Sequence, residues 1–556
     1  MHPTKNTLDS ILKDRTVIPR WKSPQQAVET YSSDKAQLHR RTTLGNTWIK
    51  HLEATFDQHP SANTANELYE TALLYGHTDS LPPSVKKLSR QLRDDMAIPD
   101  ANTWQHGASL EQRPFTLGDT VDVHEDAARL EIHRLRRLLA ESSDRPFCWS
   151  ELARHFLVVG EKDKSIRCIQ AALKLAKHNR YLCRVATRLF VHVKDPDRAL
   201  NLLRSEPTIK SDPWLLAAEI ATSSIVSKQS RFLDVGKQLV TSNYFNENQL
   251  SELAAAIGTV ELVHGTTKRA KALFSKSLIA PTENSLAQAQ WAVEHDSKIV
   301  IPLAAWQTPE SYEAKTLASR QAHDWQNALQ TCASWLADEP FSIRPALMGS
   351  YLGFRPEHAA MAEQFATAGL RCDSANSHLL NNRAVARVYQ GKINEAYADV
   401  RAALEHGSAR DDAHLMATLG LIAFRSGMPE LGREYYALSI AWFSQAKENT
   451  SVASAMLYLL REEMQIDQSA ISQSVDMAHR IAKLPMAIRQ PELIGMTELV
   501  LEEARVAANV SPAASDRAIV APASHDEFSR YASLFHVPEK AKQLALRLGD
   551  YSALIG

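Results

Sequence analysis

Apolar and small residues recur along the chain at the spacing of amphipathic helices, and one arrangement repeats. A small residue is followed by a large residue four positions later, a small residue seven later and an apolar residue eight later. Positions i, i+4, i+7 and i+8 share one face of an α-helix, so each copy predicts a helix with one closely packed face. The clearest copies are Ala328-Cys332-Trp335-Leu336, Ala362-Ala366-Gly369-Leu370, Ala396-Val400-Ala403-Leu404 and Gly432-Tyr436-Ser439-Ile440.

The first residues of these copies lie 34, 34 and 36 residues apart, which indicates a repeated structural unit. Upstream copies are less regular, and the interval from Ala270 to Ala328 is 58 residues. A glycine stands five residues before three of the copies, where it predicts a left-handed helix end and a chain reversal. The upstream copies begin at Ser165, Ala199 and Ala270, and the turn glycines are Gly160, Gly391 and Gly427.

Small residues on both helices of a hairpin allow the two helices to approach closely. One hairpin cannot bury its apolar faces, whereas stacked hairpins bury a continuous core. The pattern therefore predicts an all-α fold, an α-solenoid of stacked antiparallel helix hairpins.

These spacings resemble the tetratricopeptide repeat, and the resemblance covers roughly residues 146–444. The most specific match lies in residues 380–404, with Asn382-Arg383-Ala384, Gly391, Glu395-Ala396 and Ala403-Leu404 in the positions that the family uses. Arg387 departs from the family, which has an apolar residue there, so this hairpin either packs loosely or neutralises the arginine. The resemblance implies a superhelix whose concave face grips peptides or helices of a partner.

The chain divides into five predicted segments. The first contains helices at residues 43–56 and 65–75 and a long irregular connection at residues 98–122, and we expect it to cap the repeat array. A strongly helical stretch opens at Glu125. The segments are an N-terminal helical segment (1–122), the first part of the array (123–310), its second part (311–510), a linker (511–524) and a helical tail (525–556).

Composition narrows the class of protein further. The chain has 63 Lys and Arg against 64 Asp and Glu, so no global charge attracts nucleic acid or anionic lipid. The N-terminus is polar, and the longest apolar run, residues 415–424, is far shorter than a membrane span and predicts a buried helix. The five cysteines are scattered, which favours reduced core residues. We predict a cytoplasmic protein without a membrane segment.

The sequence contains no common catalytic motif: no P-loop, GxGxxG, HExxH, GxSxG or EF-hand loop. We therefore predict no enzymatic activity, no cofactor and no metal. His51-Leu52-Glu53 resembles half of a deaminase zinc site, but no Pro-Cys-x-x-Cys follows. Two arginine–histidine pairs fit the short pattern of helical ribonucleases, at a frequency expected by chance. They are Arg401 with His406 and Arg530 with His536.

A basic stripe in the helical stretch after residue 125 is an alternative contact site for nucleic acid, because guanidinium groups bind phosphates in a forked geometry. Local acids balance it, and we expect Leu130, Leu135, Leu138 and Leu139 to mark the buried side of this helix. A solvated helix face is the stronger interpretation. The stripe consists of Arg129, His133, Arg134, Arg136 and Arg137.

The concave face of the array is the preferred candidate site. Two successive first helices place equivalent residues at i, i+3, i+4, i+7 and i+11, on what we expect to be the open side. The asparagine-and-lysine clamp for a C-terminal carboxylate is incomplete, because the preceding copy offers Pro345, Ala346 and Gly349. The predicted partner-binding residues are His378, Asn381, Asn382, Tyr389, His414 and Arg425.

The resulting hypothesis is a non-enzymatic scaffold, adaptor or regulatory subunit that binds a peptide or helix of a protein partner in this groove. Two alternatives stay open: a helical protein that binds or cleaves RNA, and a sensor that binds a small peptide or nucleotide in the same groove. Nothing in the sequence specifies the oligomeric state.

Overall fold

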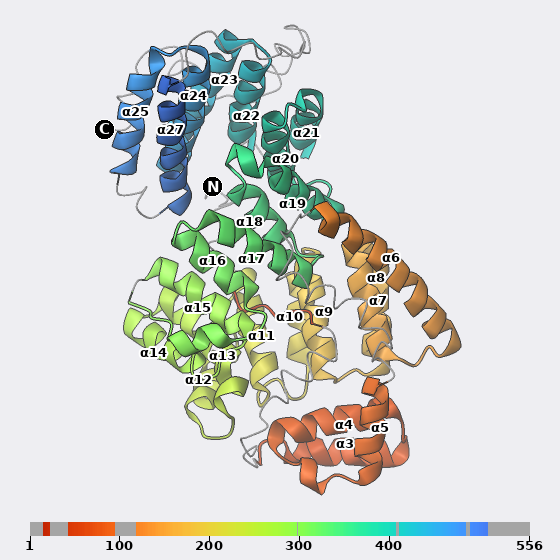
Figure 1. The fold of residues 1–556 in the computed structure, drawn as a ribbon. Helices are drawn as coiled ribbons and strands as arrows, with labels where there is room; N and C mark the ends of the chain where they lie inside the picture. The colour runs from red at the N-terminus through yellow and green to blue at the C-terminus, as the bar shows by residue number, and fades with distance from the viewer. Residues whose placement is uncertain are drawn as a thin grey trace. The chain divides into compact units, whose positions relative to one another are not determined.

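Most of the chain that the structure describes is helical. The computed structural model describes residues 15–22, 43–94, 118–296, 298–406, 411–484 and 490–509. Helices are the regular elements of these ranges, and no strand occurs in them (Figure 1). The predicted all-α class is confirmed. The chain forms two compact units, unit 1 (Met1–Ala318 with Ser334–Ser342) and unit 2 (Ser319–Ala333 with Ile343–Gly556).

Unit 1 contains an N-terminal group of helices and a longer series of helix hairpins. Its helices are α3 (Asn46–Gln58), α4 (Ala62–Tyr75), α5 (Pro83–Asp94), α6 (Gly118–Glu141), α7 (Pro146–Val158), α8 (Lys162–Leu175), α9 (Arg180–His192), α10 (Pro196–Ser205), α11 (Pro213–Ile225), α12 (Leu233–Thr241), α13 (Glu247–His264), α14 (Thr267–Ser277) and α15 (Glu283–His295). Short 3-10 turns occur at Thr78–Ser80 and Leu303–Gln307.

The boundary between the units passes through the next two helices, α16 (Tyr312–Gln321) and α17 (Trp325–Asp338). Unit 2 continues with α18 (Ile343–Leu352), a 3-10 turn at Pro356–His358, α19 (Ala359–Cys372), α20 (Ser377–Tyr389), α21 (Ile393–His406), α22 (Asp411–Arg425), α23 (Pro429–Gln445), α24 (Asn449–Ile466), α25 (Ala470–Ala482) and α27 (Pro491–Asn509).

Consecutive helices pair as antiparallel hairpins, and the first helices of successive hairpins lie side by side. In unit 1 the pairs include α7 with α8 and α13 with α14, while α9, α11, α13 and α15 contact one another in series. In unit 2, α20 pairs with α21 and α22 with α23, while α18, α20, α22 and α24 form the corresponding series. Such stacking defines an α-solenoid of tetratricopeptide-like hairpins, as predicted.

The turns between hairpin helices use a left-handed residue whether or not it is glycine. Gly160, Gly391 and Gly427 have φ of 77°, 76° and 78°, as their position predicted. Lys194 and His323 occupy the equivalent position, five residues before Ala199 and Ala328, with φ of 65° and 59°. In each turn, the residue after the left-handed one donates its N–H to a carbonyl five residues earlier. Backbone geometry is thus more regular than the glycine pattern suggests.

The small residues of the repeated pattern lie at the predicted helix contacts. Ala328, Ala396, Ala403 and Ala199 are fully buried. Hydroxyl groups at equivalent positions bond to the first helix of their hairpin, as in the 2.7 Å bond from Ser165 Oγ to the Ala153 carbonyl. The long interval between residues 270 and 328 arises because α15 and an irregular connection precede α16.

The N-terminal helices cap the array of unit 1, as expected. Residues of α3, α4 and α5 share one hydrophobic core with residues of α11, α13 and α15. The helix expected to open at Glu125 begins earlier, at Gly118, so residues 118–122 are helical rather than irregular. Residues 98–117, the linker 511–524 and the tail 525–556 lie outside the described residues.

Arg387 is neutralised. Its guanidinium pairs with Glu363 at 2.9 Å and with Asp399 at 2.8 Å, and Arg383 makes a bidentate bond to the same aspartate. Lys392 also pairs with Glu363. A small ion-pair network therefore replaces the apolar contact that the family normally has at this point.

Candidate functional site

The six predicted partner-binding residues lie on two neighbouring first helices, α20 and α22. Thr418 Oγ1 of α22 donates to Asn381 Oδ1 of α20 at 2.7 Å, and Asn382 Nδ2 donates to Ser350 Oγ of α18 at 3.0 Å. These bonds join successive first helices along one side of the series. We call this side, with His378, Asn381, Asn382, Tyr389, His414 and Arg425, the α20–α22 face.

Tyr389 and Arg425, expected on an open side, are instead held against α24. Arg461 Nη1 donates to the Tyr389 hydroxyl at 2.8 Å, and Arg425 makes a bidentate pair with Glu462 at 2.7 and 2.8 Å. Both guanidinium groups lie over the Tyr389 ring, 5.1 Å (Arg461) and 5.8 Å (Arg425) from its centroid. Burial raises the pKa of Tyr389 well above its ordinary value, so its hydroxyl stays protonated.

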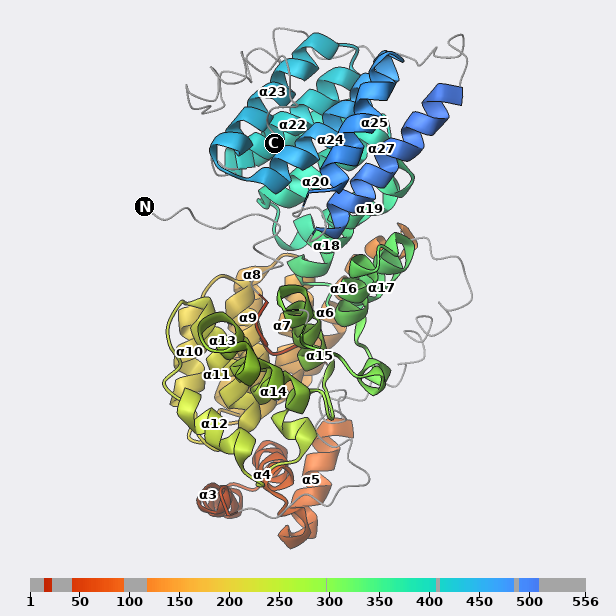
Figure 2. The ribbon, with the colours of Figure 1, turned by 90° about the vertical axis from the view of Figure 1, so that its left-hand side faces the viewer.

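Sequence reasoning placed residues 311–510 in the helical array but missed the contacts by which its helix α27 extends this network. Arg461 makes a bidentate pair with Glu503 of α27 at 2.7 and 2.9 Å. At the other end of α27, Glu492 pairs with Arg320, and Gly495 lies directly against Trp325 and Phe354. Helix α27 therefore contacts Arg320 and Trp325 at the start of unit 2. It also packs beside α24 and α25 (Figure 2).

The first half of α27 is buried except at Ile494, which is half-buried, and Glu498, which is exposed. Such a helix is enclosed by its neighbours rather than laid on a surface. Its buried residues include Glu492, Leu493, Met496, Thr497, Leu499 and Val500. Unit 2 thus encloses much of α27 among its other helices.

The N-terminal ends of α20 and α22 form the other part of the face. His378 and Asn381 are half-buried, and so is His414, whose ring packs edge-on against Phe443 with centroids 4.7 Å apart. Imidazole and amide groups at half-buried positions can donate to and accept from a bound peptide. The face therefore combines a fixed cationic and aromatic end with a half-buried polar end.

The basic stripe lies on α6 as an exposed helix face. Arg129, His133, Arg136 and Arg137 are exposed, and Arg129 pairs with Glu125 at 2.6 Å. Arg134 is half-buried and pairs with Glu131 at 2.8 Å. The expected buried side is wrong in one respect, because Leu130 is 70% exposed; the buried residues are Ala128, Ile132, Leu135 and Leu139.

In unit 1, an extended segment near the N-terminus lies among the helices of the array. Residues 15–22 form neither helix nor strand and run between α9 and α15, where both views show them in dark red (Figures 1 and 2). Alternate residues Arg15, Val17, Pro19 and Trp21 are buried, as expected for an extended chain with one side turned into the array. We call residues 15–22 the N-terminal segment.

Side chains of the array bind the backbone of the N-terminal segment. Gln288 Nε2 donates to the Arg15 carbonyl, Asn284 Nδ2 to the Ile18 carbonyl and the Tyr181 hydroxyl to the Lys22 carbonyl, each at 2.9 Å. The same asparagine and glutamine accept from the Arg15 guanidinium at 2.8 and 2.6 Å. Amide side chains of the array therefore bind both the backbone of the segment and the side chain of Arg15.

Five carboxylates surround the three cations of the N-terminal segment. Arg15 pairs with Glu313 at 2.9 Å, and Arg20 pairs with Glu313 and Glu339 at 2.5 and 3.2 Å. We call these carboxylates the acidic site; its members are Glu283, Glu310, Glu313, Asp338 and Glu339. Burial raises the pKa of Asp338 to about 7, although Arg20 opposes the shift.

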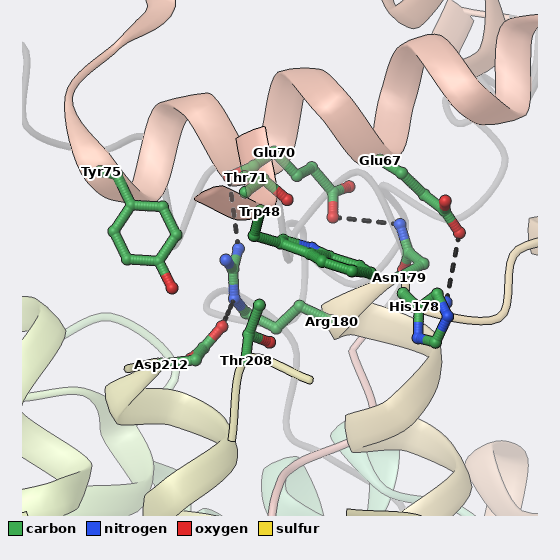
Figure 3. Close-up of a pocket in the computed structure, with 10 residues that line it drawn as sticks. All are labelled: Trp48, Glu67, Glu70, Thr71, Tyr75, His178, Asn179, Arg180, Thr208 and Asp212. Atoms are coloured by element: carbon green, nitrogen blue, oxygen red, sulfur yellow. Dashed lines mark hydrogen bonds and ion pairs between the residues drawn. The ribbon is translucent and has the colours of Figure 1, made fainter. Parts of the chain in front are cut away.

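A small pocket joins the N-terminal cap to the array in unit 1. Glu67 and Glu70 of α4 face His178, Asn179 and Arg180 at the start of α9 (Figure 3). Asn179 Nδ2 donates to Glu70 at 3.1 Å, and the His178 N–H donates to Glu67 at 3.3 Å. The free space accommodates about one water molecule, which is too little for an organic ligand. The pocket is therefore a polar contact between α4 and the start of α9, which we call the polar joint.

This joint makes the stability of unit 1 pH-dependent. Burial raises the pKa of Glu67 to about 7, against 4.5 for an unburied glutamate. Between about pH 4.5 and 7 the folded state keeps a proton that the unfolded chain has lost, so this group lowers stability as pH rises. We expect Glu67→Gln to remove on the order of 1–3 kcal/mol of that loss. Urea denaturation at pH 5 and 7.5 measures it, with exposed Asp57→Asn as control; parallel behaviour of the two variants would contradict it.

The described residues of the other chemical hypotheses do not lie in a pocket or a cluster of catalytic side chains. Arg401 and His406 are exposed on α21, and His51 is exposed and stacks on Trp48. Arg530 and His536 lie outside the described residues.

No group of three or more metal-binding side chains occurs in the described ranges. No described helix has the length and apolarity to cross a membrane. All five cysteines are buried and unbridged.

Two solved structures that resemble this chain share little of its sequence. No protein-family model matches the chain, and no curated protein matches it. Yeast Tom70 is similar with a TM-score of 0.29 and 11% identity, over 71% of this chain and 98% of that chain. A chain of the APC/C hetero-tetramer Cut9-Hcn1 is similar with a TM-score of 0.36 and 13% identity, over 89% and 97%. The class of the protein, a tetratricopeptide-like helical repeat, follows from its own hairpins, turns and buried small residues.

Proposed function

We propose that the protein is a non-enzymatic scaffold, adaptor or regulatory subunit whose unit 2 binds a protein partner through the α20–α22 face. The observation that carries the proposal is the alignment of polar and aromatic side chains on two adjacent first helices, joined by the Thr418–Asn381 hydrogen bond. Stacked hairpins provide such a surface in a preformed state, which reduces the entropic cost of binding.

The arrangement suits a peptide or helix of a partner. His378, Asn381 and His414 are accessible enough to form hydrogen bonds, while Tyr389 and Arg425 belong to residue types that often dominate binding energy. The ion pair with Glu462 fixes Arg425 before binding, so little side-chain entropy is lost. The cytoplasmic location stays a prediction.

The test leaves Asn381 unchanged, because it accepts the hydrogen bond that joins α20 to α22. We expect His378→Glu to weaken partner binding at least tenfold, about 1.4 kcal/mol, with little change in melting temperature. A quantitative pull-down from the native host identifies the partner, and titration of the purified partner measures the affinity.

The control is the basic stripe, where Arg136→Glu with Arg137→Glu should leave the complex intact, because both residues are exposed on α6. If the stripe variant loses the partner and the face variant keeps it, the proposal is wrong. Salt-sensitive binding of mixed RNA by the native protein, abolished in the stripe variant, would favour the RNA-binding alternative.

A further inference from the structure

We propose that the acidic site of unit 1 is a receptor for an extended basic peptide of a partner protein, and that the N-terminal segment is its tethered competitor. The ligand would carry the spacing of residues 15–22: an arginine, four residues, then a second arginine, an aromatic residue and a lysine. This site lies in unit 1 and is separate from the α20–α22 face of unit 2.

The first argument is that the contacts are those of a peptide complex. The segment has no regular secondary structure, and side chains of Gln288, Asn284 and Tyr181 satisfy three of its carbonyl groups. Hydrogen bonds to backbone carbonyls are available to any extended peptide, whatever its side chains. They provide affinity, while the side-chain sites provide specificity.

The second argument is the charge of the site. Its five carboxylates follow the N-terminal segment by about 260 or more residues in the sequence. Cations of the segment neutralise most of these carboxylates. Arg188 adds one array cation, 3.3 Å from Glu339. If the segment left, buried carboxylates would lose their partners, which is strongly unfavourable. The vacated site would therefore select a cationic replacement.

The third argument is the aromatic position. Trp21 is 1% exposed and packs edge-on against Phe341, with ring centroids 5.5 Å apart. It belongs to the hydrophobic core formed by α6 to α9, whereas Val17 belongs to the core of α11 to α15. The segment thus fills two apolar sites four residues apart, which sets the spacing that a competing peptide must match.

The experiment uses the full chain with a protease recognition sequence inserted between Lys22 and Thr43. After cleavage, a fluorescent peptide with the sequence of residues 15–22, RTVIPRWK, should bind, as measured by anisotropy. Uncleaved protein should bind it at least tenfold more weakly, because the tethered segment competes at a high effective concentration. A peptide with both arginines replaced by alanine should bind the cleaved protein at least about 100-fold more weakly.

Matched variants test the acidic site itself. Glu313→Gln in the cleaved protein should weaken the peptide at least tenfold, since Glu313 contacts both arginines, whereas exposed Glu161→Gln should have no effect. Cleaved protein that stays folded by circular dichroism but ignores the peptide, or binds the alanine peptide equally well, overturns the proposal.

An uncleaved variant covers the case in which cleavage unfolds the chain. Arg20→Ala removes the contacts with Glu313 and Glu339 and should strengthen peptide binding at least tenfold relative to the uncleaved native protein. Unchanged binding overturns the proposal. A native dimer that dissociates in Arg20→Ala would also overturn it, because it would assign the site to a second copy of the chain.

Discussion

Replacing Arg461 by alanine should lower the free energy of unfolding by about 3 kcal/mol, because the change leaves a buried polar network without its central cation. Arg461 is 1% exposed, donates to the Tyr389 hydroxyl and pairs in bidentate fashion with Glu503. Its loss would also remove the ion pair between α24 and α27. Chemical denaturation monitored by helix content measures the effect.

The matched control is Arg433→Ala. Arg433 also makes a bidentate pair, with Glu463 at 2.7 and 2.8 Å, but its side chain is 36% exposed. Exposed ion pairs contribute little, so we expect a loss of at most about 1 kcal/mol. Equal losses in the two variants would show that burial does not determine the contribution of the Arg461 pair.

Gly432→Leu should destabilise the protein by about 3 kcal/mol or more, because α22 and α23 meet at two glycines. A Cβ on Gly432 would lie 2.4 Å from the Phe424 ring and 3.1 Å from the Gly420 carbonyl. A side chain therefore forces apart two helices that approach closely in this hairpin, and overpacking a core typically costs about 1–3 kcal/mol, occasionally more.

Glu434→Leu is the control for this prediction, since Glu434 lies two residues further along α23 and is exposed. It should change the melting temperature by no more than a few degrees, as other surface substitutions do. If thermal unfolding shows the same shift for both leucine variants, the close approach at Gly432 is not important for stability.

The hairpins were predictable from the sequence because their determinants are local. Ala328, Ala396 and Gly432 each begin a nine-residue pattern that predicts a helix contact. Turns at Lys194 and His323 escaped the glycine pattern, although they have the same left-handed backbone. There the tertiary pairing of the helices imposes a conformation that the residue itself does not favour.

Long-range pairing explains what the sequence did not show. The contacts of α27 join Glu492 to Arg320 and Glu503 to Arg461, residues 172 and 42 positions apart. The sequence around a charged residue does not show which distant residue pairs with it, so only the helical character of α27 could be predicted. The same holds for Tyr389 and Arg425: helical periodicity placed them on one face, but could not show that residues of α24 bind both side chains.

The position of the N-terminal segment has a consequence for biosynthesis. The ribosome releases residues 15–22 early, but their partners Glu313 and Glu339 follow about 300 residues later. At ~5–20 residues per second, the segment emerges roughly 15–60 s before its binding site can be completed. During that interval three cations and a tryptophan are available to chaperones or proteases. Unit 1 therefore acquires its final contacts only after more than half of the chain has been translated.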